Sequence, residues 1–252
     1  MNRKIALVAF AFAFATQSAG AVEIKVLTAG AFKQVLLAVV PDYEKQTGNT
    51  VKIENDTVGA VVKRIEGGDA FDVVIVSPAA VDDLAKKGKV AADSHTNLAK
   101  VGVGVVVKEG AARPDIGSVE AFKRALIAAK SVAYIDPASG GSSGIFVDRL
   151  LDKLGIAGDV KPKAKLIPGG AVADHVANGE AEIGIHQISE ILPVKGAVLV
   201  GPLPAEIQNY TIYAAGLAAA SKEAEAGKAL IKLLAGPGAA AVLSAKGMQP
   251  TQ

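Results

Sequence analysis

A stretch rich in glycine and serine, Asp136–Gly144, contains residue types that suit an anion. It separates a short apolar run from a helical pattern, which places it at a helix N-terminus, where free N–H groups and the helix dipole favour negative charge. The hydroxyls of Ser139, Ser142 and Ser143 can donate hydrogen bonds, and Gly144 allows close backbone approach. The alternative interpretation is local, with Ser142 only capping its own helix.

The same stretch contains the letters G-x-S-x-G around Ser142, which occur at the nucleophile of serine hydrolases. That chemistry also requires an acid and a histidine downstream, and the sequence marks neither. The stretch is not a phosphate-binding P-loop, because no Gly-Lys-Ser/Thr follows at the required spacing.

Three further loops join an apolar strand-like run to a helical pattern: Thr28–Lys33, Asp56–Ala60 and His186–Ser189. Ligands of parallel α/β sheets bind beyond such strand ends. The candidate ligand-binding residues in and after these loops are Gly30, Ala31, Phe32, Thr57, Gly59, Arg64, His186 and Gln187.

Three of these candidates have a second interpretation. Phe32 begins an apolar stripe at helical spacing, which is typical of a core residue. Arg64 follows Lys63 and could lie on a solvated helix face rather than bind a carboxylate. His186 ends a strand, where it could bind an anion, transfer a proton or serve only a structural role.

The elements that must position these loops alternate between strand and helix patterns. The runs at 22–28, 51–54 and 71–76 alternate with helical segments, and a second series follows through 131–135, 164–166 and 182–186. This order predicts an α/β fold of two lobes, each with a mixed, mostly parallel sheet flanked by helices. We expect residues 22–103 with 207–252 to form the first lobe and residues 104–206 the second.

The first 21 residues have the pattern of a secretory signal peptide. Arg3 and Lys4 precede the apolar run 5–15, and Ala19-Gly20-Ala21 resembles a cleavage site. The chain holds 27 basic and 25 acidic residues, so its slight excess of positive charge belongs to this leader. We therefore expect export, and no nucleic-acid partner, since nucleic acids bind concentrated basic faces.

Cysteine is absent and only three histidines occur, at scattered positions. Disulfides and cysteine-based nucleophiles are therefore excluded. A zinc site is not expected, because the residues that usually hold zinc are missing or isolated. The sequence suggests no metal or other cofactor.

The chain resembles the periplasmic molybdate-type substrate-binding proteins of ABC transporters along nearly all of its mature length. The resemblance rests on VLTAGAFKQVL, GDAFDVVIV, IDPASGGSSG, VANGEAEIGIHQISEI and LIKLLAGPGAAAVLSAKGM. It implies a type II periplasmic binding protein fold with a ligand cleft between the lobes. It also implies a small anionic ligand and an inner-membrane ABC permease as partner. We expect a periplasmic protein that works as a monomer.

The resemblance departs at the loops that would hold molybdate. Serines typical of such proteins are missing from Thr28–Ala31 and from Thr57–Ala60. The stretch Val132–Gly140 and the pattern E-x-G-x-x-Q-x-S-E at 182–190 are instead similar to a branch that includes aconitate isomerase. We expect a non-enzymatic receptor for an oxyanion or organic carboxylate. The alternative is an exported isomerase of an unsaturated polycarboxylate, with His186 as candidate base and Lys33 and Arg64 as candidate cations.

Overall fold

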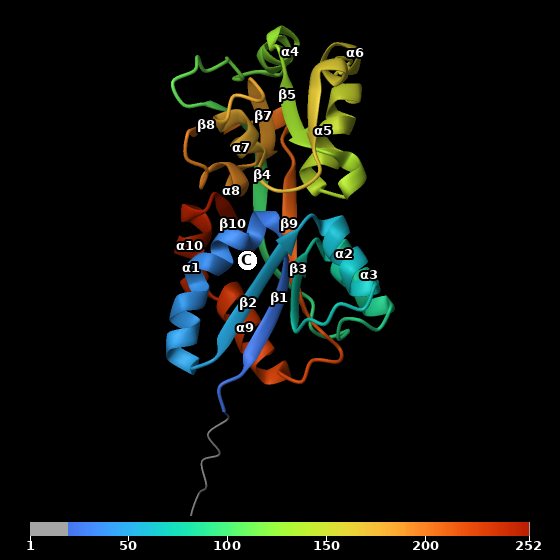
Figure 1. Cartoon of the computed structure of the whole chain (residues 1–252), viewed down its shortest axis with the longest axis vertical. Coiled ribbons are helices and arrows are strands. Elements are labelled where there is room, and N and C mark those ends of the chain that lie inside the picture. Colours follow the sequence, from blue (N-terminus) through green and yellow to red (C-terminus); the bar gives the residue numbers. More distant parts are fainter. Residues whose placement is uncertain (1–19, 252) are drawn as a thin grey trace, which may run out of the picture.

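Two α/β lobes are joined by two long strands, β4 (Thr96–Lys108) and β9 (Tyr210–Leu217) (Figure 1). The computed structural model describes residues 20–251. Residues 1–19 of the expected leader therefore lie outside the described residues. Among residues 20–251, no single helix is long and apolar enough to cross a bilayer. The pair Ala224–Ala235 and Pro237–Ala245 meets that length and composition only together, with a 58° bend between them.

The first lobe begins with three βα units. Their elements are β1 (Glu23–Ala29), α1 (Gly30–Thr47), β2 (Thr50–Asp56), α2 (Val58–Glu66), β3 (Val73–Val76) and α3 (Pro78–Lys86). β1 pairs in parallel with both β2 and β3. The C-terminal segment returns to this lobe as α9 (Ala224–Ala235), α10 (Ala240–Ala245) and β10 (Met248–Pro250).

The second lobe contains the middle of the chain. Its elements are α4 (Val119–Ala128), β5 (Val132–Ile135), α5 (Ser142–Lys153), α6 (Ala157–Val160), β6 (Ala164–Ile167), α7 (Val172–Ala177), β7 (Ile183–Gln187), α8 (Ile188–Ile191) and β8 (Ala197–Pro202). β5 pairs in parallel with β6 and β7, while β7 and β8 run antiparallel to β4. A short 3-10 turn, Pro137–Ser139, lies inside the serine-rich loop.

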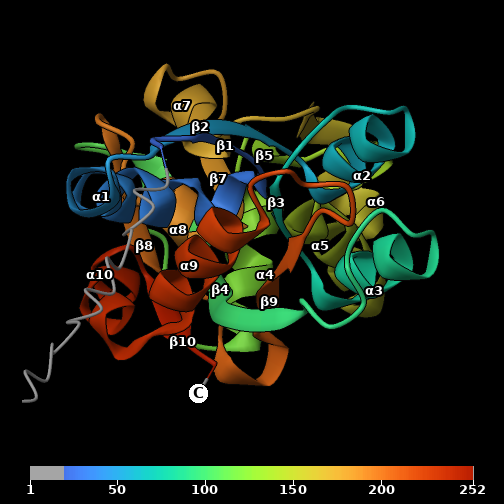
Figure 2. The same ribbon diagram turned by 90° about the horizontal axis from the view of Figure 1, so that it is seen from below.

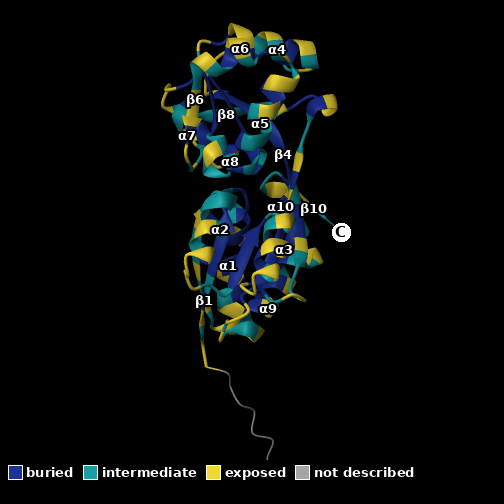
Figure 3. Ribbon diagram, turned by 90° about the vertical axis from the view of Figure 1, so that its right-hand side faces the viewer, coloured by how far each residue is buried: buried dark blue, intermediate teal, exposed yellow. Residues whose placement is uncertain are grey.

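The strand order is β2-β1-β3-β9-β4-β7-β5-β6, with β8 and β10 also paired to β4. The predicted α/β fold with mixed sheets is confirmed. Helices cover both faces of the first-lobe strands, with α1, α9 and α10 on one side and α2 and α3 on the other (Figure 2). The central strands are accordingly buried, whereas the outer helix faces are exposed (Figure 3).

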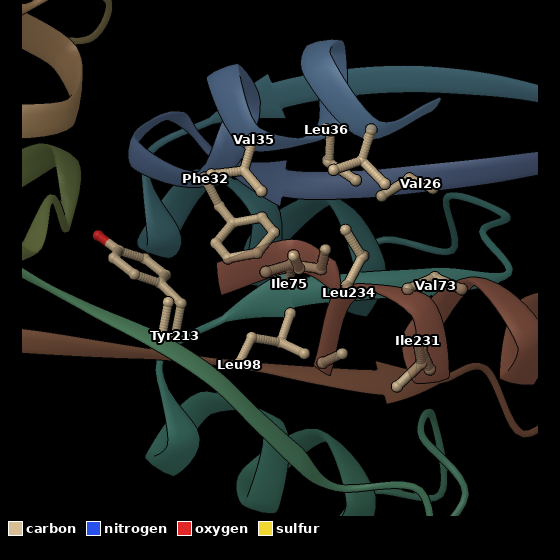
Figure 4. Close-up of a cluster of buried hydrophobic side chains, with 14 of the residues drawn as sticks. Val26, Phe32, Val35, Leu36, Val73, Ile75, Leu98, Tyr213, Ile231 and Leu234 are labelled. Carbon is tan, nitrogen blue, oxygen red and sulfur yellow. The ribbon is translucent and has the colours of Figure 1, made fainter. Parts of the chain in front are cut away.

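The largest apolar cluster lies between α1, the sheet and α9. Phe32, Val35 and Leu36 of α1 pack towards Ile75 of β3, and Leu234 of α9 closes the far side (Figure 4). The i, i+3, i+4 spacing along α1 puts these side chains on one face, as its sequence predicts. This packing fixes α1, and with it the loop at its N-terminus.

The two crossing strands change partners at one point. β4 pairs with β9 from Thr96 to Gly102 and with β7 from Val103 to Val107. The side-chain amide of Gln208, just before β9, accepts from the Val103 N–H and donates to the Val103 carbonyl, both at 2.9 Å. We propose that this point and the return at residue 207 form the lobe boundaries that the sequence predicts.

Candidate functional site

A small cavity lies where the loops of the two lobes meet. Its volume is about 40 Å³, against roughly 10–15 Å³ for a single water by the same measure. A carboxylate group or a small oxyanion matches this size. The walls include Gly30, Ala31, Asn55, Asp56, Thr57, Ser142, Ser143, His186, Gln187, Glu190 and Tyr213.

Two helices point uncapped N-termini at this cavity. The N-cap residues of α1 and α5 are Ala29 and Gly141, which have no side-chain oxygen to accept from the first N–H groups. Gly30 and Ala31 of α1 and Ser142 and Ser143 of α5 line the cavity directly. Since a helix leaves its first four N–H groups without an internal partner, both ends are available to an anion.

The N-terminus of α2 is used differently, because it joins the lobes. The Thr57 hydroxyl caps α2 by accepting from the Ala60 N–H at 3.2 Å. The same hydroxyl donates to the Ser139 carbonyl of the second lobe at 2.6 Å. The Gly59 N–H donates to the Gly140 carbonyl at 3.2 Å. A Cβ on Gly59 would lie 2.8 Å from the Gly140 Cα, so only glycine permits this approach.

Two buried side chains at the end of β7 present polar atoms without a partner. Gln187 is 3% exposed, and its Oε1 accepts a hydrogen bond from the Tyr213 hydroxyl at 2.9 Å. Within residues 20–251, the Gln187 Nε2 and the His186 Nδ1 have no hydrogen-bond partner. Buried polar groups are almost always paired. Both residues line the cavity, so a group bound there can satisfy these atoms.

His186 at the end of β7 and Glu190 in α8 form a buried pair, four residues apart in the chain. The His186 Nε2 lies 3.2 Å from the Glu190 Oε2, and the two side chains are 2% and 15% exposed. Burial lowers the pKa of His186. Burial raises the pKa of Glu190 to about 8, while nearby Lys33 opposes this rise. At neutral pH burial therefore favours an uncharged imidazole beside a protonated carboxyl.

Seven of the residues predicted from the sequence line the cavity, on four separate elements: Gly30, Ala31, Thr57, Ser142, Ser143, His186 and Gln187. Ser142 is the first residue of α5 rather than its cap, which removes the purely capping interpretation. His186 pairs with Glu190 and not with Ser142. The arrangement therefore lacks the base that a serine nucleophile needs.

Two of the remaining residues that the sequence predicts to bind the ligand, Phe32 and Arg64, make other contacts. Phe32 is fully buried in the α1 cluster (Figure 4). The Arg64 guanidinium is bound by Glu54 and by Asp69, in the second case at 2.8 Å. Burying apolar surface and neutralising charge explain both positions. Neither residue lines the cavity.

Three more predicted residues serve the loops around the cavity. Gly59 contacts Gly140, and the Ser139 hydroxyl donates to the Asp136 carbonyl at 2.8 Å. Gly144 packs on β5, where a Cβ would lie 2.1 Å from the Ile135 carbonyl oxygen. We therefore remove these residues from the proposed set of direct ligand contacts.

The structure adds residues that sequence reasoning missed. Glu190 lies in α8 and reaches His186 because that helix follows directly on β7, a turn of the chain that no residue periodicity announces. Tyr213 is 26 residues from Gln187 and reaches it only through the crossing of β9. No local pattern predicts that contact. No group of His, Asp or Glu able to hold a metal is found among residues 20–251.

Comparison with known proteins gives consistent matches. The sequence profile of the bacterial extracellular solute-binding proteins matches residues 24–249. An aconitate isomerase of Pseudomonas sp. is 35% identical over 231 residues, covering 89% of this chain and 87% of the relative. A molybdate-binding protein of Azotobacter vinelandii is 28% identical over 242 residues, covering 91% of each.

Solved structures agree in fold. The periplasmic molybdate-binding protein of Azotobacter vinelandii superposes with a TM-score of 0.78 at 21% identity, covering 91% of this chain and 100% of that one. A sulfate-binding protein of Mycobacterium tuberculosis gives 0.73 at 17% identity, covering 92% and 88%. At such identities the similarity establishes a shared architecture.

Proposed function

Since the chain belongs to the bacterial extracellular solute-binding protein family, we propose that it captures a small anion, an oxyanion or an organic carboxylate, between its lobes. One observation carries the proposal: two uncapped helix N-termini and the unpartnered buried Nε2 donor of Gln187 surround one small cavity. Such groups favour a negative ligand without needing a cationic side chain in contact with it.

Transport follows from the same proposal. The mature protein would work in the periplasm after removal of its leader, and would pass its ligand to an ABC permease. Relatives named for molybdate and sulfate binding support this role. Closure of the lobes would enclose the anion, because the loops that line the cavity come from both lobes.

A panel of anions tests the proposal. A ligand that binds only the folded protein raises the melting temperature. We expect a rise with at least one of molybdate, tungstate, sulfate, phosphate, citrate, cis-aconitate and trans-aconitate. Stabilisation by none of them at millimolar concentration would contradict anion capture.

Variants then locate the site. Ser142→Ala and Gln187→Leu should each weaken the best anion about tenfold, since hydrogen bonds to charged groups contribute ~1.5–3 kcal/mol. Ser118→Ala is the matched control, because Ser118 caps α4 away from the cavity. It should lower stability and leave the affinity unchanged. Equal affinity of all three variants for the anion would show that it binds outside this cavity.

A second candidate function, isomerisation of an unsaturated polycarboxylate, is favoured by the His186–Glu190 pair. An allylic shift breaks one C–H bond at a methylene, moves the double bond by one position, and forms a C–H bond at the former vinylic carbon. The pair can take up and return that single proton, so no oxidant or other co-reactant is needed. The aconitate isomerase of Pseudomonas supports this candidate.

Turnover distinguishes the two functions. Incubation with cis- or trans-aconitate in D₂O should give interconversion and deuterium incorporation, measured by absorbance and NMR. Glu190→Gln should abolish both and retain binding. A protein that binds aconitate but neither converts it nor exchanges its protons is a receptor only.

A further inference from the structure

A larger chamber adjoins the small cavity. The chamber has a volume of about 380 Å³, and it shares Gly30, Asn55, Gly170 and Glu190 with the inner cavity. A ligand that reaches from one space into the other would pass these shared residues. Glu190 stands at the boundary between the two spaces.

The chamber carries two lysines from different lobes. Lys33 belongs to the first turn of α1, and Lys195 lies in the loop between α8 and β8. In the part of the chain from 20 to 251, neither lysine makes an ion pair. Asp174 also lines the chamber and carries the opposite charge. With the Glu190 carboxyl protonated, the chamber is positive overall.

We propose that Lys33 and Lys195 bind a second carboxylate of the ligand whose first carboxylate occupies the inner cavity, so that the solute is a di- or tricarboxylate. The proposal rests on the anion capture proposed above and deepens it. A tetrahedral oxyanion could fill the inner cavity, but it has no second group for the chamber. A di- or tricarboxylate has a second carboxylate that can occupy the chamber. The carbon chain that joins its carboxylates would then lie next to Glu190.

The two lysines also suit this role by position. Because Lys33 comes from the first lobe and Lys195 from the second, a carboxylate between them would hold the closed arrangement together. A lysine ammonium on a flexible stem can adjust to chains of different length. The inner cavity would then select the anionic group, and the chamber would select the number of carboxylates.

Calorimetric titration of the full mature chain tests this subsite. The probes are acetate, succinate, citrate, trans-aconitate and molybdate, and the variants are Lys33→Gln, Lys195→Gln and the double variant. Each substitution should weaken citrate, succinate and trans-aconitate roughly three- to tenfold, as expected for a partly exposed ion pair. Acetate and molybdate should change less than about twofold, since they do not reach the chamber.

Lys45→Gln is the matched control. Lys45 lies on the same helix at its opposite end, and its substitution removes the same charge. It should leave every affinity unchanged. If the Lys33 and Lys195 variants weaken the binding of molybdate and acetate as much as that of citrate, the lysines only attract anions by their charge. The proposed carboxylate subsite would then be wrong. Unchanged affinity for citrate in the lysine variants also overturns the subsite. If the wild-type protein binds none of the anions, the proposal of anion capture itself is overturned.

Discussion

Gln187 uses the two ends of its side-chain amide for different purposes. The Oε1 is held by Tyr213, and the Nε2 is left facing the cavity. Gln187 also lines the cavity, so an anion bound there can accept from this donor while Tyr213 holds the other end of the amide. Removing such a hydrogen bond to a charged group costs about 1.5–3 kcal/mol.

Glu190 should make anion binding depend on pH. Burial raises its pKa to about 8, with Lys33 acting in the opposite direction. His186 of β7 and Tyr213 of β9 also line the inner cavity, and burial keeps both neutral. The other charged groups around Glu190 are Asp56 in the inner cavity and Asp174 and Lys195 in the chamber. Below pH 8 the carboxyl is neutral, and above it a carboxylate repels the bound anion. Affinity for a ligand that stays fully ionised should therefore fall as pH rises through about 8.

Glu190→Gln should remove this pH dependence, because an amide keeps its donor and never ionises. Titration calorimetry between pH 6 and pH 9 measures the effect in both proteins. Glu206→Gln changes an exposed carboxylate outside the cavity and should retain the wild-type profile. A profile in Glu190→Gln that matches the wild type would assign the titration to another group.

For single residues, the sequence predicts seven of the sixteen that line the candidate cavity. His186 and Gln187 follow a buried strand, and Gly30 and Ser142 begin helices, so local patterns reach them. Tyr213 could not be predicted, because its place depends on how β9 crosses between the lobes. Arg64 was assigned by its charge alone, and its two acidic partners are visible only in three dimensions.

Among the elements, α5 depends on an unusually close approach to β5. Gly144 lies in the first turn of α5 against the Ile135 carbonyl. Gly144→Ala should lower the free energy of unfolding by about 1–3 kcal/mol, as overpacking does. Chemical denaturation followed by circular dichroism measures this change. It should also displace Ser142 and Ser143, which reduces anion affinity.

Gly158→Ala is the matched substitution, because Gly158 lies in α6 with no atom within 4 Å of its added Cβ. We expect it to change stability by no more than about 1 kcal/mol, in the stabilising direction, as alanine is the better helix former. Equal losses in both variants would show that Gly144 is not specially crowded.

The sequence predicts the type and order of most elements because each carries its own periodicity. The sequence predicts least well those strands whose limits are set by the strands that pair with them. Residues 101–107 are an apolar run with the pattern of a strand. The strand β4 nevertheless begins earlier, at Thr96, because β9 and β10 pair with its first half. Hydrogen bonding to segments more than 100 residues away has no local signature.

For the whole molecule, Gly59 and Gly140 form a close contact between the two lobes. A Cβ on Gly59 would meet the Gly140 Cα at 2.8 Å and the Ser139 carbonyl oxygen at 2.9 Å. Gly59→Ala should therefore prevent full closure and weaken anion binding roughly tenfold, equivalent to ~1.4 kcal/mol. X-ray scattering with saturating ligand should show a larger radius of gyration than the wild type.

Gly158→Ala again serves as control and should close normally. Gly59→Ala with wild-type affinity and wild-type scattering would show that the lobes close without this contact.

The amide of Gln208 has one more consequence, and it is mechanical. It grips both backbone groups of a single residue, Val103, where the two crossing strands exchange neighbours. Two hydrogen bonds to one residue prevent β4 and β9 from sliding along each other. They leave both strands free to twist on either side of that residue. The lobes should therefore open by rotation about a fixed axis near Val103. Gln208→Ala removes both hydrogen bonds, so the lobes should then move relative to each other in more than one direction.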